Sequence, residues 1–250
     1  MSALRPLAVF AGLLVAWQAL VWALAVPPFI LPPPTRVAAT LAERWDFLAV
    51  QAATTLAEMV LGLAAGAAFG AACALVLAQF TPARRWLLPL VIASQAIPVF
   101  AIAPLLVIWF GYGIVSKVVA AALVIFFAVT STFYDGLTRT ERGFIDLARV
   151  MGASRVRLLL HVRLPAALPA LASGLRVAAV VAPIGAVIGE WVGASAGLGF
   201  VMLHANARMQ TDLMFAALFI LAIVGVALYH AVDYALRRLV PWQPVTVAQD

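Results

Sequence analysis

Residues 138–165, TRTERGFIDLARVMGASRVRLLLHVRLP, are the one long polar interval in a chain that is 66% hydrophobic. Six of the chain's 16 Lys and Arg residues lie in this interval, and a cluster of that kind cannot lie in hydrocarbon. At helical spacing, Phe144, Leu147 and Met151 share one face, so the first part of the interval predicts a short amphipathic helix.

A turn is expected inside the same interval. Gly152 suits the C-terminal end of the first helix, because glycine adopts the left-handed conformation at the least cost. Ser154 suits the N-cap of a second helix, which leads to Pro165 and the next apolar run. We therefore expect a helix, a glycine corner and a second helix, held at a membrane surface between two spans.

The composition excludes a soluble globular protein. The mean hydropathy is +1.09, and only 10% of the residues are charged, whereas about a quarter are charged in soluble domains. We predict an all-α, polytopic membrane protein in which residues 1–250 form a single transmembrane domain, because no polar segment is long enough to bury a core of its own. The net charge of +6 comes from short loops rather than a continuous basic stripe, so no nucleic-acid partner is expected.

Six apolar runs are each long enough to cross the roughly 30 Å hydrocarbon core of a bilayer. They are residues 6–26, 50–79, 87–110, 117–137, 165–190 and 213–236. The first run is interpreted as a retained anchor, with a cleaved signal peptide as the alternative, because it is longer than a signal h-region of about 7–15 residues. The second run contains Gly62, Gly66 and Gly70, and small residues of this kind let helices approach closely.

Six spans place both termini on the same side of the membrane. That side holds eleven Lys and Arg residues and the other side holds four, with Arg176 inside a span. The eleven are Arg5, Arg84, Arg85, the six of residues 138–165, Arg237 and Arg238, and the four are Arg36, Arg44, Lys117 and Arg208. By the positive-inside rule, the termini and residues 138–165 are expected to be cytoplasmic.

The spacing within the polar interval resembles the cytoplasmic EAA loop of type I ABC importer permeases. Asp146-Leu147-Ala148 is followed after three residues by Gly152, and after nine more by Val162-Arg163-Leu164-Pro165. That family has an acidic residue, a small residue and Ala, then Gly, then an aliphatic-x-Leu-Pro ending; here Asp replaces the usual Glu, and Leu replaces the first Ala. The residues that the resemblance assigns to coupling with an ATPase subunit are Asp146, Leu147, Ala148, Arg149, Gly152, Ala153, Leu164 and Pro165.

The resemblance covers nearly the whole chain and implies a fold, partners and a compartment. It implies the type I ABC importer permease fold in the bacterial inner membrane, with cytoplasmic ABC ATPase subunits that bind ATP and Mg²⁺, while this chain binds no cofactor. It also implies an extracytoplasmic solute-binding protein, contact with membrane lipid, and a second permease copy, with a homodimer favoured over a heterodimer. Residues 138–165 would be the coupling loop that carries the motion of the ATPase into the spans.

No enzyme motif is present in the sequence. The chain lacks a His-Glu-x-x-His zinc motif, a Gly-x-Ser-x-Gly nucleophile motif and a Gly-x4-Gly-Lys-Ser/Thr phosphate loop. It is therefore not expected to be an enzyme, to bind a metal or to bind nucleotide by itself. A secondary transporter driven by an ion gradient is the alternative from another class, but the inverted repeat and the relay of intramembrane acids that it predicts are not found.

The third apolar run contains Pro89, Pro98 and Pro104, so a bent or partly unwound span is expected there. Backbone groups freed at such a break are tolerated only where they face protein or a water-filled cavity. Polar, aromatic and charged residues of the spans are therefore candidates for a substrate pathway. They are Ser94, Gln95, Phe100, Trp109, Thr130, Ser131, Tyr134, Arg176 and Glu190.

Three ionisable residues of the spans carry separate expectations. Glu58 is interpreted as an interfacial acid that reaches headgroups or water. Arg176 is expected to pair with Asp135, Glu58 or a backbone carbonyl on a neighbouring helix, with a role in substrate binding second. Glu190 lies at the outer end of its span, where gating and locking of the glycine-rich loop that follows both remain open.

Two stretches, Leu31-Pro32-x-Pro34 and Gly193 to Gly199, resemble the branch of this family that imports nitrate, taurine, alkanesulfonates and thiamine-precursor pyrimidines. Residues 204–212, HANARMQTD, are similar to permeases assigned to hydroxymethylpyrimidine or formylaminopyrimidine. The expected solute is therefore a thiamine-precursor pyrimidine, with taurine, an alkanesulfonate or nitrate as the alternative.

Overall fold

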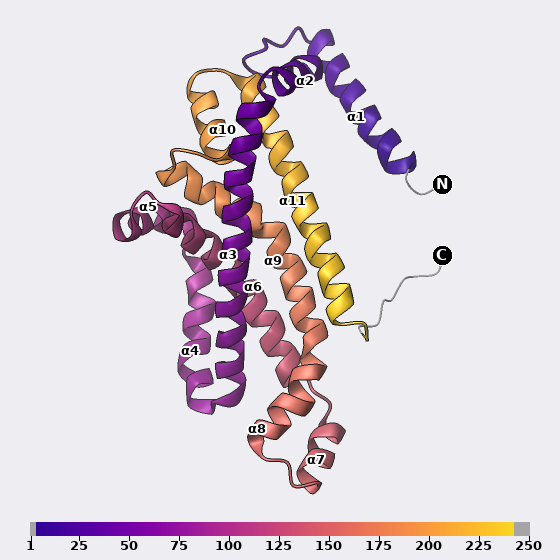
Figure 1. Cartoon of the computed structure of the whole chain (residues 1–250), viewed down its shortest axis with the longest axis vertical. Helices are drawn as coiled ribbons and strands as arrows, with labels where there is room; N and C mark the ends of the chain where they lie inside the picture. Colours follow the sequence, from indigo (N-terminus) through magenta and orange to yellow (C-terminus); the bar gives the residue numbers. More distant parts are fainter. Residues whose placement is uncertain (1–3, 243–250) are drawn as a thin grey trace.

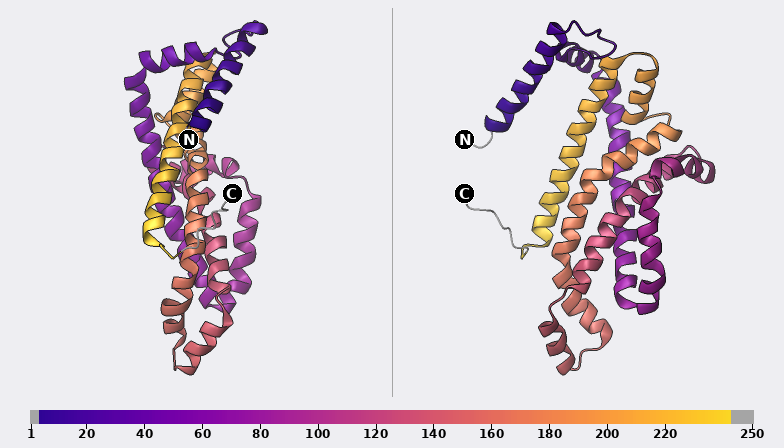
Figure 2. Two further views of the ribbon diagram at one scale, coloured as in Figure 1. Left: turned by 90° about the vertical axis from the view of Figure 1, so that its right-hand side faces the viewer. Right: turned by 180° about the vertical axis from the view of Figure 1, so that it is seen from behind.

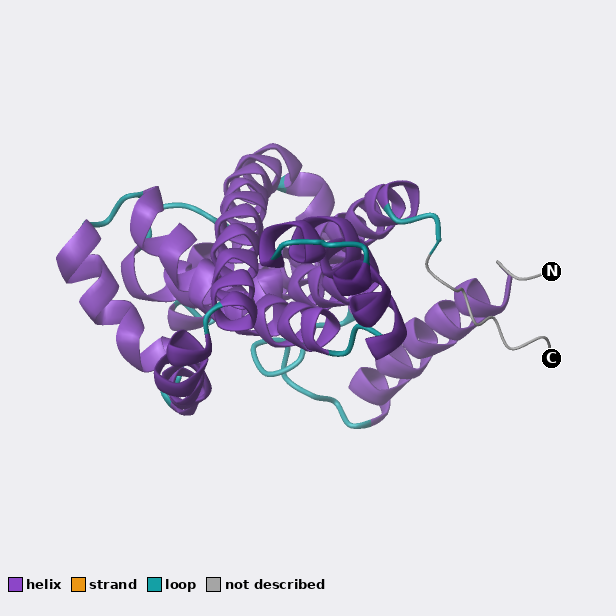
Figure 3. Cartoon of the chain, turned by 90° about the horizontal axis from the view of Figure 1, so that it is seen from below, coloured by secondary structure: helices purple, strands orange, loops and turns teal. Residues whose placement is uncertain are grey.

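The structure, a computed structural model, describes residues 4–242. Within this range every regular element is a helix and no β-strand occurs (Figure 3). The α-helices are α1 (Leu4–Ala23), α2 (Pro34–Glu43), α3 (Trp45–Gln79), α4 (Thr81–Ala93), α5 (Val99–Phe110), α6 (Ile114–Thr138), α7 (Arg142–Val150), α8 (Arg155–Leu158), α9 (Leu164–Gly193), α10 (Leu198–Ala207) and α11 (Thr211–Leu239). A 3-10 turn, η1 (Ser94–Ala96), follows α4, and a π turn, η2 (Leu159–Arg163), follows α8.

Helix α6 lies in the middle of the bundle, packed between α3 and α9 (Figure 1). Glycines on the two neighbouring helices make this close approach feasible. A Cβ atom added at Gly70 of α3 would lie 2.6 Å from the carbonyl oxygen of Phe126, and one added at Gly185 of α9 would lie 2.6 Å from Cα of Ala121. Both distances are shorter than a van der Waals contact, so larger residues there would displace α6. The close packing predicted from the glycines of the second apolar run is confirmed.

The third apolar run is broken into two helices. The segments Thr81–Ala96 and Val99–Phe110 are bent by 101° relative to each other. Pro98 stands at the break and its predecessor Ile97 is extended, with φ −94° and ψ 114°, because a residue before proline is disfavoured in the helical region. The predicted bend is confirmed at Pro98, whereas Pro89 and Pro104 lie inside α4 and α5 without ending them.

Four helical segments within residues 4–242 are long and apolar enough to cross a membrane, and the bent α4–α5 pair would add a fifth. The four are Trp45–Gln79, Ile114–Thr138, Arg155–Gly193 and Thr211–Leu239. They match the predicted runs apart from their ends: α3 begins at Trp45 rather than at residue 50, and α8, η2 and α9 form one continuous segment. In α1 the apolar stretch Ala11–Ala23 is shorter than these spans, so the total of six spans stays a prediction.

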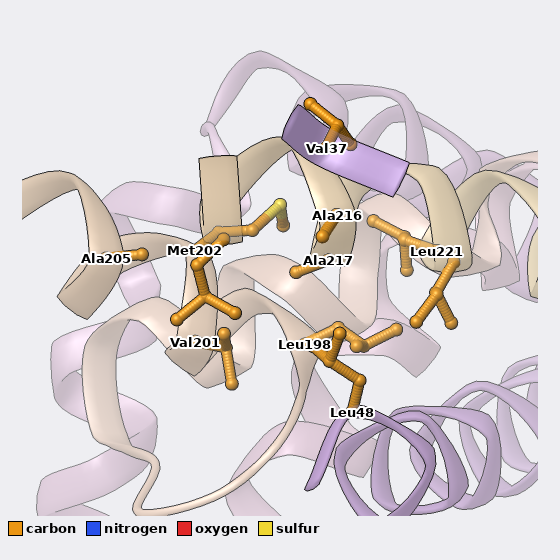
Figure 4. Packing of buried hydrophobic residues seen from close by; sticks show 11 residues of the cluster. Val37, Leu48, Leu198, Val201, Met202, Ala205, Ala216, Ala217 and Leu221 are labelled. Atoms are coloured by element: carbon orange, nitrogen blue, oxygen red, sulfur yellow. The ribbon is translucent and has the colours of Figure 1, made fainter. Parts of the chain in front are cut away.

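Helix α10 packs an apolar face against α11, α9 and α3, and Val37 of α2 joins the same buried cluster (Figure 4). The buried side chains of this cluster are Val37, Leu48, Leu198, Val201, Met202, Ala205, Leu213, Ala216, Ala217, Ile220 and Leu221. Figure 1 shows that the cluster lies at the end of the bundle opposite α7 and α8. The segment after α9 is therefore held against the bundle by packing as well as by the polar contacts described below.

Helix α1 leans away from the bundle toward its N-terminal end (Figures 1 and 2). Trp17 packs on Phe215 of α11, with ring centroids 5.4 Å apart, and Val21 is buried. Helices α3, α6 and α11 run toward the end that carries α7 and α8, whereas α4 and α9 run away from it (Figure 1). Because the helices alternate in direction, α7 and α8 lie at one end of the bundle and α10 lies at the opposite end (Figure 1).

Candidate functional site

Helix α7 protrudes beyond the ends of α3, α6 and α9 (Figure 1). Its apolar side chains are exposed to solvent: Phe144 by 59%, Leu147 by 58% and Val150 by 86%, and Met151 just after the helix by 78%. We call these four side chains the apolar face of α7. A contiguous set of exposed apolar side chains, rimmed by charged ones, marks a surface that contacts another protein or the membrane.

A glycine corner ends α7, as the sequence predicts. Gly152 has φ +77°, its N–H donates to the carbonyl of Arg149 over 2.9 Å, and the N–H of Ala153 donates to the carbonyl of Ala148 over 2.9 Å. These bonds satisfy carbonyl groups that the helix end would otherwise leave free. Ser154 then caps α8 and accepts from the N–H of Arg157 over 3.4 Å, so both predicted features of the turn are confirmed.

The second helix of the interval differs from the expectation in its form. Only Arg155–Leu158 is α-helical, and the π turn η2 joins it to α9 without a break. Pro165 has no N–H to donate to the carbonyl of His161, four residues earlier, and a widened turn stands at that place. Because α8, η2 and α9 are continuous, a displacement of the corner at Gly152 passes directly into a long helix of the bundle.

The predicted coupling residues lie in three different environments. Asp146 and Arg149 lie on α7 as an exposed pair, with 3.4 Å between Oδ1 and Nη1. Leu147 and Ala148 line an apolar groove of about 370 Å³ on the opposite face of α7. Leu164 packs against the buried cluster around Phe133 and Leu137, where it fixes the start of α9. The contact of these residues with an ATPase subunit stays a prediction.

A buried ion pair joins α3 and α6 inside the bundle. The Nζ atom of Lys117 lies 2.9 Å from Oε1 of Glu58, and the two side chains are 7% and 0% exposed. The interpretation of Glu58 as an interfacial acid is therefore wrong. Helix α3 begins at Trp45, thirteen residues earlier, which places Glu58 about 20 Å along the helix. Gly189 of α9 leaves room for this pair, because a Cβ atom there would lie 2.9 Å from Cα of Lys117.

Both carboxylate oxygens of Glu190 accept hydrogen bonds near the Glu58–Lys117 pair. Its Oε1 accepts from the hydroxyl of Thr55 over 2.6 Å. Its Oε2 accepts from the N–H of Gly199 and from the N–H of Phe200, the latter over 3.3 Å. These N–H groups belong to the first turn of α10, where backbone donors are free and a negative charge is stabilised by the helix dipole.

Helix α3 completes the cap of α10 with two further side chains. The Thr55 hydroxyl accepts from the N–H of Leu198 over 2.8 Å, and Oε1 of Gln51 accepts from the N–H of Gly197 over 2.7 Å. We call Gln51, Thr55, Glu58, Lys117 and Glu190 the buried polar network. It ties α3, α6, α9 and α10 together, and it locks the glycine-rich segment after α9, which is one of the two roles left open for Glu190.

The sequence reasoning did not single out Gln51, Thr55 or Lys117. A signal was available, because Gln51, Thr55 and Glu58 are spaced by four and three residues and so share one face of an otherwise apolar helix. A polar stripe of this kind inside a span predicts partners within the bundle. The partner on α6 could have been sought at Lys117, the only lysine of the chain.

Arg176 pairs with a residue that the sequence did not suggest. Its Nε lies 2.7 Å from Oδ1 of Asp233 on α11, and Nε of Arg237 lies 2.9 Å from the other oxygen of the same carboxylate. The expected pairing with Asp135 or Glu58 is wrong, because Asp135 lies beside Arg139 and Glu58 is held by Lys117. The general expectation of a structural partner for Arg176 is confirmed.

The candidate pathway residues of the broken span lie at its bend and on α5. Ser94 and Gln95 form η1, where the Ser94 hydroxyl donates to the carbonyl of Val91 over 2.7 Å. Phe100 is 55% exposed and Trp109 is 65% exposed. These four side chains are accessible from outside the chain.

The candidates on α6 are engaged within the bundle. Thr130 is 2% exposed, and its hydroxyl donates to the carbonyl of Phe126 over 2.7 Å. The hydroxyl of Ser131 donates to the carbonyl of Ala128 over 3.4 Å, and Tyr134 packs against the cluster around Phe133. In this structure these residues serve helix packing and do not line an open surface with Phe100 and Trp109.

The fold defines a helical membrane protein in which α7 protrudes with its apolar face exposed and a buried polar network joins four helices. Residues 66–243 match the family described as "Binding-protein-dependent transport system inner membrane component", and the chain belongs to this family. It is a type I ABC importer permease, a multi-pass protein of the bacterial inner membrane.

Similar proteins match over nearly the whole chain. A probable ABC transporter permease protein of Haemophilus influenzae is 52% identical, with 95% of this chain and 97% of that protein covered. A formylaminopyrimidine transport permease protein of Halalkalibacterium halodurans is 36% identical, with 97% of each covered. A riboflavin transport system permease protein of Chloroflexus aurantiacus is 38% identical, with 92% of this chain and 87% of that protein covered.

A solved structure shares the fold. The MetNI methionine ABC transporter in an inward-facing conformation matches with a TM-score of 0.67 and 21% identity, with 77% of this chain and 96% of that chain covered. At this identity the match bears on the fold alone.

Proposed function

We propose that this chain is the permease subunit of an ATP-driven importer for a thiamine-precursor pyrimidine, hydroxymethylpyrimidine or formylaminopyrimidine. In this proposal cytoplasmic ABC ATPase subunits bind ATP and Mg²⁺, and an extracytoplasmic binding protein delivers the solute. Two copies of this chain form the pathway between them. The six spans are α1, α3, the α4–α5 pair, α6, α9 and α11, which places both termini in the cytoplasm.

The apolar face of α7 is the observation that carries the proposal. Fully burying a side chain such as Phe144, Leu147 or Met151 is worth about 1.5–3 kcal/mol each, which is enough for a stable contact when several are buried together. The continuous α8–η2–α9 segment then conveys the movement of a docked ATPase into the bundle. A protruding docking helix that leads through a continuous helical segment into a span is what ATP-driven transport by separate subunits requires.

Two observations support a flat heterocycle as the solute. Phe100, just after the bend of the third span, and Trp109, near the end of α5, present exposed aromatic rings, and such rings stack on pyrimidines. Arg176 is held by Asp233 over 2.7 Å, so its guanidinium is already engaged in an ion pair, which disfavours it as a receptor for a sulfonate or nitrate. The similarity to a formylaminopyrimidine permease agrees with this choice, and a riboflavin permease of comparable identity also moves a nitrogen heterocycle by its name.

The importer is tested by a matched pair of substitutions. Met151→Asp places a charge on the apolar face of α7, and Met209→Asp places the same charge at the other end of the molecule, where Met209 is 60% exposed. We expect Met151→Asp to abolish co-purification of the ATPase subunits and ATP-driven uptake into proteoliposomes, and Met209→Asp to keep ATPase binding. ATPase subunits that stay bound to the Met151→Asp protein would contradict the docking role of α7.

The solute is tested on the binding protein encoded with this permease. We expect hydroxymethylpyrimidine or formylaminopyrimidine to raise its melting temperature, because a ligand that binds only the native state stabilises it by RT ln(1 + [L]/Kd). Riboflavin, taurine, an alkanesulfonate and nitrate are the comparison ligands. A shift with one of these and none with either pyrimidine would overturn the substrate assignment and leave the importer proposal standing.

A further inference from the structure

The polar face of α7 borders a basic pocket that is separate from the apolar face. The pocket has a volume of about 770 Å³ and is formed by the end of α6, by α7 and by the end of η2. Four arginines line it: Arg139 after α6, Arg142 and Arg149 on α7, and Arg163 at the end of η2. Two carboxylates, Glu141 and Asp146, also line the pocket, so its formal charge is +2, four minus two.

The positive charge of the pocket is poorly compensated by the chain itself. Arg149 lies 3.4 Å from Asp146 and Arg139 lies 3.4 Å from Asp135, but all four side chains are more than half exposed, and exposed pairs contribute little. Neither Arg142 nor Arg163 has an ion pair within residues 4–242.

Arg163 also presents an unmet hydrogen-bond donor. Its Nε is buried, and no acceptor among the described residues bonds to it. A buried guanidinium N–H without an acceptor is costly, and an anion in the pocket accepts from it only if the Arg163 side chain turns further into the pocket. The donors point to a ligand rich in acceptor oxygens.

The position of the pocket suits an anion at the membrane surface. Thr138, the last residue of α6, and Arg163, eight residues inside the continuous segment Arg155–Gly193, both line it, so the pocket lies near the α7 end of two candidate spans. On the cytoplasmic side that the proposed topology gives to residues 138–165, this is the level of the phosphates of the inner leaflet, which is rich in anionic lipids.

The geometry points to a binding site for a phosphate group in this pocket, with the arginines of three elements as its ligands. A planar guanidinium group can donate two parallel N–H bonds to two oxygens of one phosphate. This geometry makes arginine the preferred partner of phosphate. The phosphate belongs either to the headgroup of an anionic phospholipid or to a small soluble compound. A bound phosphate would bridge the end of α6, α7 and the start of α9, and so hold the docking helix at a fixed angle to the spans.

The test compares two pairs of arginines with equal charge. Arg142→Gln with Arg163→Gln removes the two pocket cations that have no ion pair, and Arg84→Gln with Arg85→Gln removes two exposed cations from the start of α4 at the same end of the bundle. The full-length permease is placed in nanodiscs of phosphatidylcholine with a rising fraction of phosphatidylglycerol, and native mass spectrometry counts the bound anionic lipid. In neutral detergent, the line width of the ³¹P signal of inorganic phosphate reports binding of the soluble anion.

We expect the Arg142/Arg163 variant to bind at least about tenfold more weakly than the wild type, because two charge-assisted contacts are lost, while the Arg84/Arg85 variant binds normally. Loss of phosphatidylglycerol alone identifies a lipid site, and loss of inorganic phosphate identifies a site for a soluble compound. Equal loss in both variants would mean non-specific attraction and would overturn the site, as would normal binding by the Arg142/Arg163 variant. The exposed single variant Arg142→Gln keeps the test informative if Arg163→Gln alters folding, and it should lose part of the binding. These outcomes are independent of the solute, because no transport is measured.

Discussion

Replacing Lys117 with Met tests whether the buried polar network stabilises the bundle. Met has a similar length and an apolar side chain, so the substitution removes the ammonium without leaving a large cavity. Glu58 then stays fully buried in the bundle without its partner. We expect a loss of about 3–5 kcal/mol of stability, the usual cost of removing one member of a buried ion pair.

A second variant separates the effect of the lost ion pair from the effect of the lost side-chain packing. A double variant, Glu58→Gln with Lys117→Met, removes both charges and keeps the approximate shape, so it should be clearly more stable than Lys117→Met alone. The two substitutions should therefore not be additive, with an interaction energy of about 0.5–3 kcal/mol. Arg208→Met, at an exposed residue just after α10, serves as the control and should change stability by less than about 0.5 kcal/mol.

The assay is thermal unfolding of the purified permease in a mild detergent, followed by circular dichroism. Relative to wild type, the expected order of melting temperatures is Arg208→Met unchanged, the double variant lower and Lys117→Met lowest. A Lys117→Met protein as stable as the wild type, or a double variant that loses the sum of the two single effects, would show that Glu58 and Lys117 do not act as a pair. The reasoning about the network would then be refuted.

Three further predictions concern the glycines and the coupling loop. Gly70→Ala should cost about 1–3 kcal/mol, because its Cβ would lie 2.6 Å from the carbonyl of Phe126; Gly143→Ala, with nothing within 4 Å, should leave the melting temperature unchanged or raised. Gly152→Val, at φ +77°, should uncouple ATP hydrolysis from uptake in proteoliposomes, whereas Gly152→Asn should retain coupling because Asn tolerates this conformation. Asp146→Lys should weaken co-purification of the ATPase subunits, and unchanged recovery would contradict its role.

Structural features that depend on a few neighbouring residues could be predicted from the sequence. The end of α7 at Gly152 and the cap at Ser154 follow from conformations that these residue types favour over a few positions. The bend at Pro98 follows from the same kind of rule. Long apolar runs likewise place the spans to within several residues, because hydrophobic length depends on composition alone.

The sequence was insufficient where the partner lies on another helix. Glu58 pairs with Lys117 across 59 residues and Arg176 pairs with Asp233 across 57, and both pairings depend on how each helix is rotated about its axis. The π turn before α9 is likewise not predictable from α-helical spacing, which holds no signal for a widened turn at Leu159–Arg163. Rotation is decided by the packing of small residues such as Gly185 against α6, and one sequence does not give it.

The glycines of the segment after α9 are required by the structure, whichever solute is transported. Gly197 has φ +113°, and a Cβ atom at Gly199 would lie 2.7 Å from Oε2 of Glu190. A larger side chain at either position would displace the carboxylate that caps α10, so glycine is required there by Glu190. Any permease with this cap needs the same glycines, whatever it transports. The similarity of residues 193–199 to other permeases therefore supports the fold and the cap of α10 by Glu190. The assignment of a pyrimidine depends instead on Phe100, Trp109 and the binding protein.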